Sequence, residues 1–301
     1  MTRTIKYLLL MLITIVVGTY FFITCCSECG AAVVTEPTTE KEIIKEPSAT
    51  SYPFAIDGNG FAYNTNDNYN FNVSSHNFLT PLSADLTKGI TGLQGHLAEN
   101  ENNVINVTGY YTSQEENNTA FPNLGLARAN SIKNDLASKG FSTAQINTQG
   151  KLMDEMIAKE GTYWGAASFG LVEKSATAED DLKALYEKIN ADPLILYFNT
   201  AEASIHLDAM QRQKVADISR YLDKVSDAKA SVVGHTDSQG RASTNMRLGQ
   251  DRAEFAKNYL MQNGIAADKI IATSKGQTQP IADNATEEGR VKNRRTVITL
   301  K

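Results

Sequence analysis

The sequence predicts an α/β fold in which two domains follow an apolar N-terminal helix. Three observations lead to this expectation: an uncharged apolar run near the N-terminus, short apolar strands alternating with amphipathic helices further along the chain, and a first half that repeats the pattern of the second. We divide the chain into an anchor at 1–29, a flexible linker at 30–51, a first domain at 52–172, a helical linker at 173–192 and a second domain at 193–301.

The uncharged run from Tyr7 to Thr24 predicts a membrane-spanning helix, because at about 1.5 Å per residue it matches the hydrocarbon thickness of a bilayer. Arg3 and Lys6 precede the run, and the next basic residue is Lys41. This asymmetry places the N-terminus in the cytoplasm and the rest of the chain outside it. A cleaved signal peptide is the rival interpretation, but its apolar core is usually shorter and its cleavage site carries small residues. We therefore favour an uncleaved anchor.

The only cysteines, Cys25, Cys26 and Cys29, lie just beyond this run. They could form a disulfide, link two chains or, at Cys25 or Cys26, accept a lipid. No catalytic or metal-binding role is expected for them, since no histidine lies nearby. The linker that follows is rich in Thr, Glu, Lys and Pro and reads as an extended tether. The later linker at 173–192 contains a helical pattern that we expect to bridge the domains.

The second domain alternates between strand and helix patterns. The predicted elements are a strand at Leu194–Phe198, a helix marked by Val215, Ile218, Leu222 and Val225, a strand at Ser231–Gly234, a helix that carries Arg252 and ends at Gly264, a strand at Lys269–Thr273 and a strand at Arg295–Leu300. This order predicts a mixed sheet with helices packed over it. Binding groups are expected at the strand ends and loops of such a scaffold.

One acid and one arginine in this domain suggest a binding site. Asp237 follows the strand that ends near Gly234, and Arg252 interrupts a helical stripe formed with Leu248, Phe255 and Tyr259. A charge within an apolar stripe is unfavourable unless it is paired or a ligand needs it, and Asp237 is the nearby candidate partner. A carboxylate beside a guanidinium suits a zwitterion.

These residues belong to a longer pattern that resembles the OmpA-like peptidoglycan-binding family. Its elements here are Gly234-His235-Thr236-Asp237, Asn245, Leu248-Gly249, Arg252-Ala253, Gly264-Ile265, Pro280 and Asn293-Arg294-Arg295. The resemblance covers about a third of the chain, from around Pro193 to Lys301. It implies an OmpA-like domain there and non-enzymatic binding of peptidoglycan, and with the repeat described below the fold expected is two OmpA-like α/β sandwich domains. It also implies that Asp237 and Arg252 grip the diaminopimelate of the stem peptide. Ser274-Lys275-Gly276 departs from the Gly-x-Gly that members often carry, which affects loop shape only.

The expected ligand site contains five residues: Asp237 for the ammonium, Arg252 for the carboxylate, Thr236 with its neighbouring backbone N–H groups, Asn245 to fix the loop or reach the stem peptide, and Leu248. No cofactor and no metal are expected. His235 is expected to be a packing histidine, with a His-Asp dyad as the alternative. Arg290, Arg294 and Arg295 are expected to form a solvated row, with Asn293 capping a turn.

The first domain is predicted to be a degenerate duplicate of the second. Segments that correspond are 71–74 with 198–201, 104–109 with 229–234, and 124–129 with 248–253, and Gly140 corresponds to Gly264. At the site itself, Thr112 stands in place of Asp237, Tyr110 in place of His235 and Phe121 in place of Asn245. Since the acid is missing, Arg128 cannot complete the same zwitterion site. The first domain is therefore expected to be structural or to bind something else.

The function predicted from this organisation is a non-covalent tether between a bacterial envelope membrane and the cell wall. The soluble domains would lie in the periplasm behind an inner-membrane anchor, with an outer-membrane lipoprotein as the alternative. Expected partners are peptidoglycan, the membrane, and a second copy or other envelope proteins. A net charge of −5 argues against nucleic acid. A stator-like accessory of a motility or transport complex is the alternative function, although the helix from Tyr7 to Thr24 lacks a carboxylate. No acid/base pair suggests a hydrolase.

Overall fold

The computed structural model describes residues 3–26, 48–198 and 206–301. It contains an N-terminal unit, Met1–Pro47, and a larger unit, Ser48–Lys301. Cys29 and most of the expected tether at 30–51 lie outside the described residues, as do the side chains of Arg3, Cys25 and Cys26. The counterpart that we expected for residues 72–74, at 199–201, also lies outside them.

In the described part of the N-terminal unit, residues 3–26, the helix α1 (Arg3–Phe21) continues into a short π-helical turn, η1 (Phe22–Cys26). The stretch Ile5–Thr24 is long enough and apolar enough to cross a membrane. An uninterrupted run of apolar residues makes a helix that is hydrophobic on every side, which is the pattern of a lipid-facing segment. Length and composition alone suit both a membrane anchor and a signal sequence near the N-terminus.

The second domain forms around a four-stranded mixed sheet in the order β10-β9-β11-β8. The strands are β8 (Leu194–Tyr197), β9 (Ala230–His235), β10 (Ile270–Gly276) and β11 (Arg295–Leu300). β10 runs parallel to β9, whereas β11 is antiparallel to both β9 and β8. The mixed α/β arrangement predicted for this domain is confirmed.

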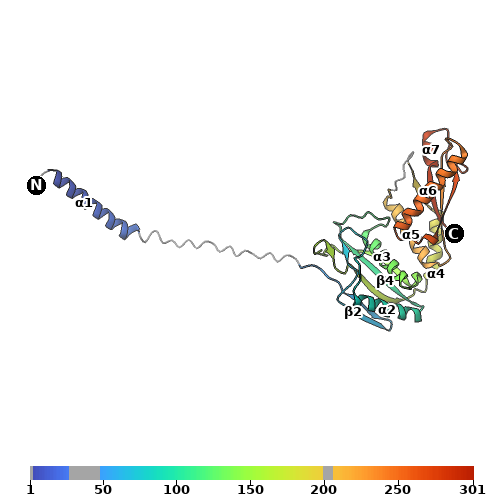
Figure 1. Cartoon of the computed structure of the whole chain (residues 1–301), viewed down its shortest axis with the longest axis horizontal. Helices are drawn as coiled ribbons and strands as arrows, with labels where there is room; N and C mark the ends of the chain where they lie inside the picture. Colours follow the sequence, from blue (N-terminus) through green and yellow to red (C-terminus); the bar gives the residue numbers. More distant parts are fainter. Residues whose placement is uncertain (1–2, 27–47, 199–205) are drawn as a thin grey trace. The chain divides into compact units, whose positions relative to one another are not determined.

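Two long helices lie on this sheet (Figure 1): α5 (Ala209–Lys224) contacts β8, and α6 (Ala242–Gln262) contacts β9 and β10. α5 begins with a capping box between Asp208 and Gln211 and buries the predicted apolar face. α6 ends at Gln262 with Asn263 as its C-cap, and Gly264 follows with a φ of +89°, the left-handed conformation that glycine adopts readily. A short 3₁₀ turn, η3 (Ala267–Lys269), then leads into β10.

The helix α7 (Glu287–Asn293) occupies a segment that we expected to be a loop. Its N-terminus is capped by the Thr286 hydroxyl, which accepts a hydrogen bond from the backbone N–H of Gly289. Because α7 ends one residue before β11, it places the Asn-Arg-Arg segment at the start of an interior strand of the sheet. α7 has only seven residues, which is too short for the hydrophobic periodicity of the sequence to predict a helix.

A glycine pair sets the distance between α6 and β9. A Cβ atom added to Gly234 would lie 1.8 Å from the carbonyl oxygen of Gly249, and one added to Gly249 would lie 2.2 Å from Ser274 Oγ. Accordingly, three of the six buried residues of α6 are small: Gly249, Ala253 and Ala256. The stripe that we predicted to face the core is therefore only half right: Arg252 is buried, while Leu248 is exposed.

The helix α4 (Ala178–Ala191) forms where a helical linker was expected. Leu185 and Ile189 are buried in the hydrophobic core of the second domain. Lys188 also forms an ion pair with Asp217 of α5 at 2.8 Å. The segment assigned to a linker thus contributes core residues to the second domain.

The first domain has a three-stranded sheet in the order β5-β4-β7. Its elements are β1 (Phe54–Gly58), β2 (Phe61–Thr65), β3 (Phe71–Asn72), α2 (Ala84–Glu99), β4 (Asn103–Tyr111), α3 (Leu124–Ser138), η2 (Thr143–Gln145), β5 (Ile146–Leu152), β6 (Thr162–Tyr163) and β7 (Ala167–Glu173). β5 is parallel to β4 and β7 is antiparallel to it, so the directions match those of β10, β9 and β11.

The close contact between a helix and a strand at a pair of glycines occurs in both domains. A Cβ atom on Gly109 of β4 would lie 2.1 Å from the carbonyl oxygen of Gly125 in α3. Gly140, with a φ of +91°, follows α3 as Gly264 follows α6. The first domain therefore shares sheet order, strand direction and helix spacing with the second.

We predict that Gly234→Ala lowers the free energy of unfolding by about 1–3 kcal/mol, because the added methyl group forces α6 away from β9. Urea unfolding of the unit Ser48–Lys301 measures this change. The matched control is Gly95→Ala in α2, where an added Cβ atom meets nothing within 4 Å. That substitution should stabilise the protein by about 0.5–1 kcal/mol, since alanine is the better helix former. A similar loss of unfolding free energy in both variants would contradict the close packing of α6 against β9 at Gly234.

Candidate functional site

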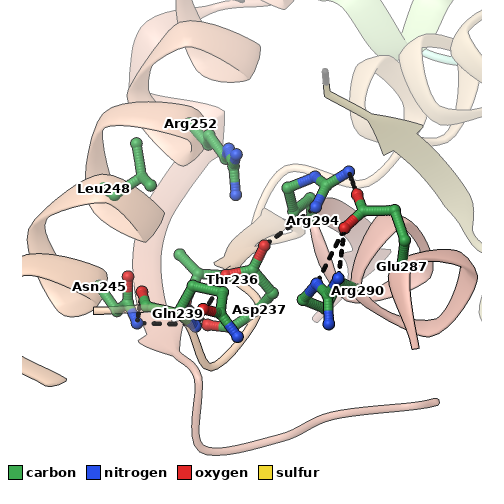
Figure 2. Close-up of a pocket in the computed structure, with 9 residues that line it drawn as sticks. All are labelled: Thr236, Asp237, Gln239, Asn245, Leu248, Arg252, Glu287, Arg290 and Arg294. Carbon is green, nitrogen blue, oxygen red and sulfur yellow. Dashed lines mark hydrogen bonds and ion pairs between the residues drawn. The ribbon is translucent and has the colours of Figure 1, made fainter. Parts of the chain in front are cut away.

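The carboxyl end of β9 opens into a pocket of ≈ 500 Å³ in the second domain (Figure 2). The loop after β9, the N-terminal half of α6, and α7 with the residue that follows it supply its walls. The lining residues are Thr236, Asp237, Gln239, Asn245, Leu248, Arg252, Glu287, Arg290 and Arg294. All five residues expected at the ligand site therefore line one pocket, and four further residues join them.

Arg252 is buried on α6 and has an uncompensated positive charge. Its Nη1 donates a hydrogen bond to the backbone oxygen of His235 at 3.0 Å, and the guanidinium lies 5.6 Å from the centre of the Phe198 ring. Within the described part of the chain, no ion pair to Arg252 is present. Burial lowers the pKa of Arg252, which nearby Asp237 raises and Arg294 lowers further, but an arginine remains charged. The guanidinium points into the pocket (Figure 2) and is suited to receive an anion.

Asp237 has a different partner from the one expected. Its Oδ2 accepts a hydrogen bond from Arg294 Nη1 at 3.0 Å, and its Oδ1 accepts one from the backbone N–H of Gln239 at 3.0 Å. The acid therefore pairs with Arg294 across the pocket, and Arg252, which the sequence offered as its candidate partner, forms no ion pair with it in the described structure. A carboxylate offers about four lone-pair positions, so each oxygen of Asp237 can still accept a further hydrogen.

Arg294 connects Asp237 to α7. Its Nη2 donates to Glu287 Oε1 at 2.9 Å, and Arg290 Nη2 donates to Glu287 Oε2 at 2.7 Å. Burial opposes ionisation of Arg294, but the hydrogen bonds that it donates to Glu287 and Asp237 raise its pKa overall. Conversely, the hydrogen bonds from Arg294 and Arg290 lower the pKa of Glu287. The pocket therefore contains a charge network that runs from Asp237 to Arg290.

The arginines near the C-terminus are not the solvated row that we expected. Arg294 and Arg295 are both buried, and only Arg290 lies nearer the surface. The spacing of Glu287, Arg290 and Arg294 at i, i+3 and i+7 places the three on one face once α7 forms. If α7 had been predicted from the sequence, this spacing would have indicated the charge network. Asn293 does cap a turn: its Oδ1 accepts from Ile281 and Ala282, and its Nδ2 donates to the Ala282 oxygen.

Asn245 holds the loop that carries Asp237. Its Nδ2 donates to the backbone oxygens of Asp237 at 3.2 Å and Gln239 at 3.0 Å, and also to Gln277 Oε1. Of the two roles left open for Asn245, the structure therefore supplies the contacts for fixing the loop. Asn245 acts as a positioning residue, because its amide nitrogen is already engaged in three contacts.

Thr236 contributes less than expected, since its backbone N–H donates to the Gly276 oxygen at 3.0 Å and its hydroxyl to the Asp237 oxygen. The N–H of Thr236 itself is therefore not free for a ligand, and the role expected for the neighbouring N–H groups stays a prediction. Leu248 lies at the rim with 39% of its surface exposed. It offers apolar contact beside the Arg252 guanidinium (Figure 2).

His235 is a buried packing residue at the end of β9. Burial lowers its pKa to about 4, and nearby Arg295 and Lys275 act in the same direction. The ring is therefore neutral at pH 7, and its Nδ1 is buried without a hydrogen-bond partner in the described structure. In residues 3–26, 48–198 and 206–301, no cluster of three or more His, Cys, Asp or Glu side chains is placed to hold a metal ion.

Comparisons with known proteins match the second domain. A model of the OmpA family matches residues 197–294. The peptidoglycan-binding protein ArfA of Mycobacterium tuberculosis is 35% identical over 120 residues, which cover 40% of this chain and 36% of ArfA. The peptidoglycan-associated lipoprotein of Buchnera aphidicola is 33% identical over 122 residues, covering 40% of this chain and 68% of that protein. The crystal structure of the peptidoglycan-associated lipoprotein from Burkholderia pseudomallei is 25% identical and covers 36% of this chain and 89% of that chain, with a TM-score of 0.32.

A mixed sheet covered by helices, with an Asp-Arg pocket at the strand ends, defines the second domain as an OmpA-like α/β domain. The chain belongs to the OmpA family, and the resemblance inferred from the sequence is thereby confirmed. The chain spans only 36% of the length of its mycobacterial relatives. The similarity is thus a property of one domain.

We predict that His235 makes the second domain sensitive to acid. Its folded pKa of about 4 lies below the ordinary value of 6.5, so the unfolded chain takes up the proton first as the pH falls. The stability lost between pH 6.5 and pH 4 should approach roughly 3 kcal/mol. Urea unfolding from pH 7.5 to pH 4 measures the loss for the wild type and for His235→Gln, in which this component should be absent.

The matched control is His206→Gln, which replaces an exposed histidine. This variant should keep the pH dependence of the wild type. An equal pH dependence in wild type and His235→Gln would mean that the ring is not buried as described.

Proposed function

We propose that this protein binds peptidoglycan non-covalently through the pocket at the end of β9. One observation carries the proposal: in a domain of the OmpA family, Arg252 holds a buried, uncompensated charge directed into a pocket that also contains Asp237. Relatives that match the same domain are named for binding or associating with peptidoglycan. A buried guanidinium without a counter-ion is unfavourable by itself, and an anionic ligand group would relieve this cost.

The ligand group that fits is the free amino-acid end of diaminopimelate in the stem peptide. Its carboxylate would take a two-pronged contact from the donors of Arg252 that remain after Nη1 binds the His235 oxygen. Its ammonium would donate to the lone pairs of Asp237 that Arg294 and Gln239 leave unused. Arg294 would thus remain in place and orient the acid, while Asn245 holds the loop.

The affinity for a single stem peptide is expected to be modest. Each charge-assisted contact contributes about 1.5–3 kcal/mol, and the loss of translational and rotational freedom on association offsets much of this. The cell wall presents the same stem peptide many times, so a membrane-bound copy meets a high local concentration of ligand. A weak single site is therefore sufficient for a tether, and we assign it no catalytic step.

We propose that α1 anchors this tether in the inner membrane, with the Ser48–Lys301 unit in the periplasm. The apolar stretch Ile5–Thr24 supplies the required length. Arg3 and Lys6 on its N-terminal side orient it by the positive-inside bias. The linker expected at 30–51 would then allow the second domain to reach the wall.

We also propose that the domains at 52–172 and 193–301 derive from one duplicated unit. The shared sheet order β5-β4-β7 and β10-β9-β11, with matching strand directions, supports this origin. The glycine pairs Gly109–Gly125 and Gly234–Gly249 support it at the level of single residues. Among the described residues, the second domain has an open Asp-Arg pocket whereas Arg128 of the first domain is paired with Glu115, so we expect the second domain to bind the diaminopimelate end.

We predict that Asp237→Ala and Arg252→Ala each weaken binding to diaminopimelate-type peptidoglycan by about 10- to 100-fold. Each substitution removes the group that receives one charge of the ligand. Co-sedimentation of the Ser48–Lys301 unit with purified peptidoglycan measures the effect, with circular dichroism as the check that the variants are folded.

The matched control is Arg247→Ala, which removes an exposed arginine from the same helix but outside the pocket. It should bind like the wild type. Failure of the wild type to sediment with peptidoglycan would refute the proposal. A loss of binding in Arg247→Ala equal to that in Arg252→Ala would show that general positive charge, and not the pocket, is responsible.

A further inference from the structure

The first domain contains a second buried arginine, Arg128 on α3, with the same two anchors as Arg252. Its Nη1 donates to the backbone oxygen of Tyr110 at the end of β4 at 2.7 Å, as Arg252 donates to His235. Its guanidinium lies 5.1 Å from the centre of the Phe71 ring, as that of Arg252 lies beside Phe198. In each domain, the guanidinium group is thus held between a backbone oxygen at the end of a strand and the ring of a phenylalanine.

The two arginines differ in what meets their remaining donors. Arg128 is fully buried, and Glu115 receives it in a two-pronged contact: Nη2 to Oε1 at 2.5 Å and Nη1 to Oε2 at 3.2 Å. Tyr163 covers the guanidinium at 5.5 Å from its ring centre. In the comparison of the two halves of the sequence, Thr112 corresponds to Asp237. The sequence therefore indicated no carboxylate partner for Arg128. The structure supplies one from a residue three positions further along the chain.

The Glu115 carboxylate is itself fully held. Its Oε2 accepts a hydrogen bond from the backbone N–H of Thr112 at 2.9 Å, and its Oε1 accepts one from the backbone N–H of Ser74 at 3.0 Å. The side chain is only 1% exposed. Both oxygens therefore have a cationic and a backbone donor, which is the environment that a bound free carboxylate would need.

A difference in local structure explains how Glu115 reaches this position. In the second domain, α6 begins at Ala242, well before Leu248. In the first domain, α3 begins only at Leu124, the residue that corresponds to Leu248. The segment 112–123 is consequently a long connection and not the start of a helix. This connection folds back over α3 and carries Glu115 to Arg128.

We infer that the first domain is a carboxylate-binding site of the same design whose ligand position is permanently filled by Glu115 of the chain itself. A side chain on the same chain competes at a high effective concentration, so a free ligand cannot displace it. The inferred equivalence of Glu115 with a ligand carboxylate rests on the function proposed for Arg252. Removal of the Glu115 side chain should therefore open a latent site for a small carboxylate.

The experiment measures the thermal unfolding of the full chain in detergent micelles at pH 7.5, in sodium acetate and in sodium chloride of equal ionic strength. Trp164, the single tryptophan of the chain, lies in the first domain, so its fluorescence reports this domain. Glu115→Ala should lower the midpoint in chloride by about 10 °C, because the Arg128 charge loses its partner. Acetate should restore at least half of this loss by occupying the vacated position.

Two variants separate this effect from a general salt effect. Glu115→Gln keeps the side chain volume, so its midpoint should fall but should not respond to acetate. Glu116→Ala removes the adjacent exposed carboxylate and should behave as the wild type in both salts.

Equal midpoints of Glu115→Ala in acetate and chloride would overturn the inference, as would an acetate response of the same size in Glu115→Gln. A Glu115→Ala chain that stays unfolded at low temperature in acetate would overturn it too. The readout is the stability of the first domain, so it is independent of peptidoglycan sedimentation. Failure of the proposed function at Asp237 and Arg252 would therefore be seen separately.

Discussion

The close approach of a helix to a strand at a glycine pair is the constraint on which the rest of the second domain depends. Because Gly234 and Gly249 leave no room for a side chain, α6 lies directly against β9. Arg252, one turn further along α6, is then held against the end of the strand, where the His235 oxygen receives one of its donors. The same packing at Gly109 and Gly125 buries Arg128 in the first domain. A buried guanidinium at the strand end is thus a consequence of backbone packing.

Once the arginine is buried, its charge decides what each domain can do. Arg128 has a complete set of acceptors, since Glu115 neutralises it and carbonyl oxygens take the other donors. Within the described residues, Arg252 has one carbonyl acceptor, and the acid nearest to it, Asp237, is engaged by Arg294. A closed ion pair stabilises a domain without leaving a site, whereas an unbalanced guanidinium at a pocket favours anion binding. Two similar scaffolds therefore support a structural and a ligand-binding role.

Arg294 fixes the orientation of the Asp237 carboxylate in the open pocket of the second domain. Its bonds to Asp237 and Glu287 link the loop after β9 to α7, and Asn245 holds the same loop from the side of α6. The carboxylate is thus oriented before any ligand arrives, which reduces the loss of conformational freedom on binding. The loop after β9, α6 and α7 together hold the Asp237 carboxylate in place. A substitution in α7 is therefore expected to change the orientation of Asp237.

The sequence by itself determined the apolar helix, the mixed α/β fold of the second domain and five of the nine residues that line its pocket, because periodicity and a spaced motif are local properties. It also located both arginines and the glycines that pack beside them. Only the tertiary structure decided their partners: Asp237 pairs with Arg294 and not Arg252, and Glu115 fills the space at Arg128. Ion pairs of this kind join residues from separate elements, and they depend on where α3, α6 and α7 begin and end. Helix boundaries and loop paths follow from packing, which no local pattern encodes.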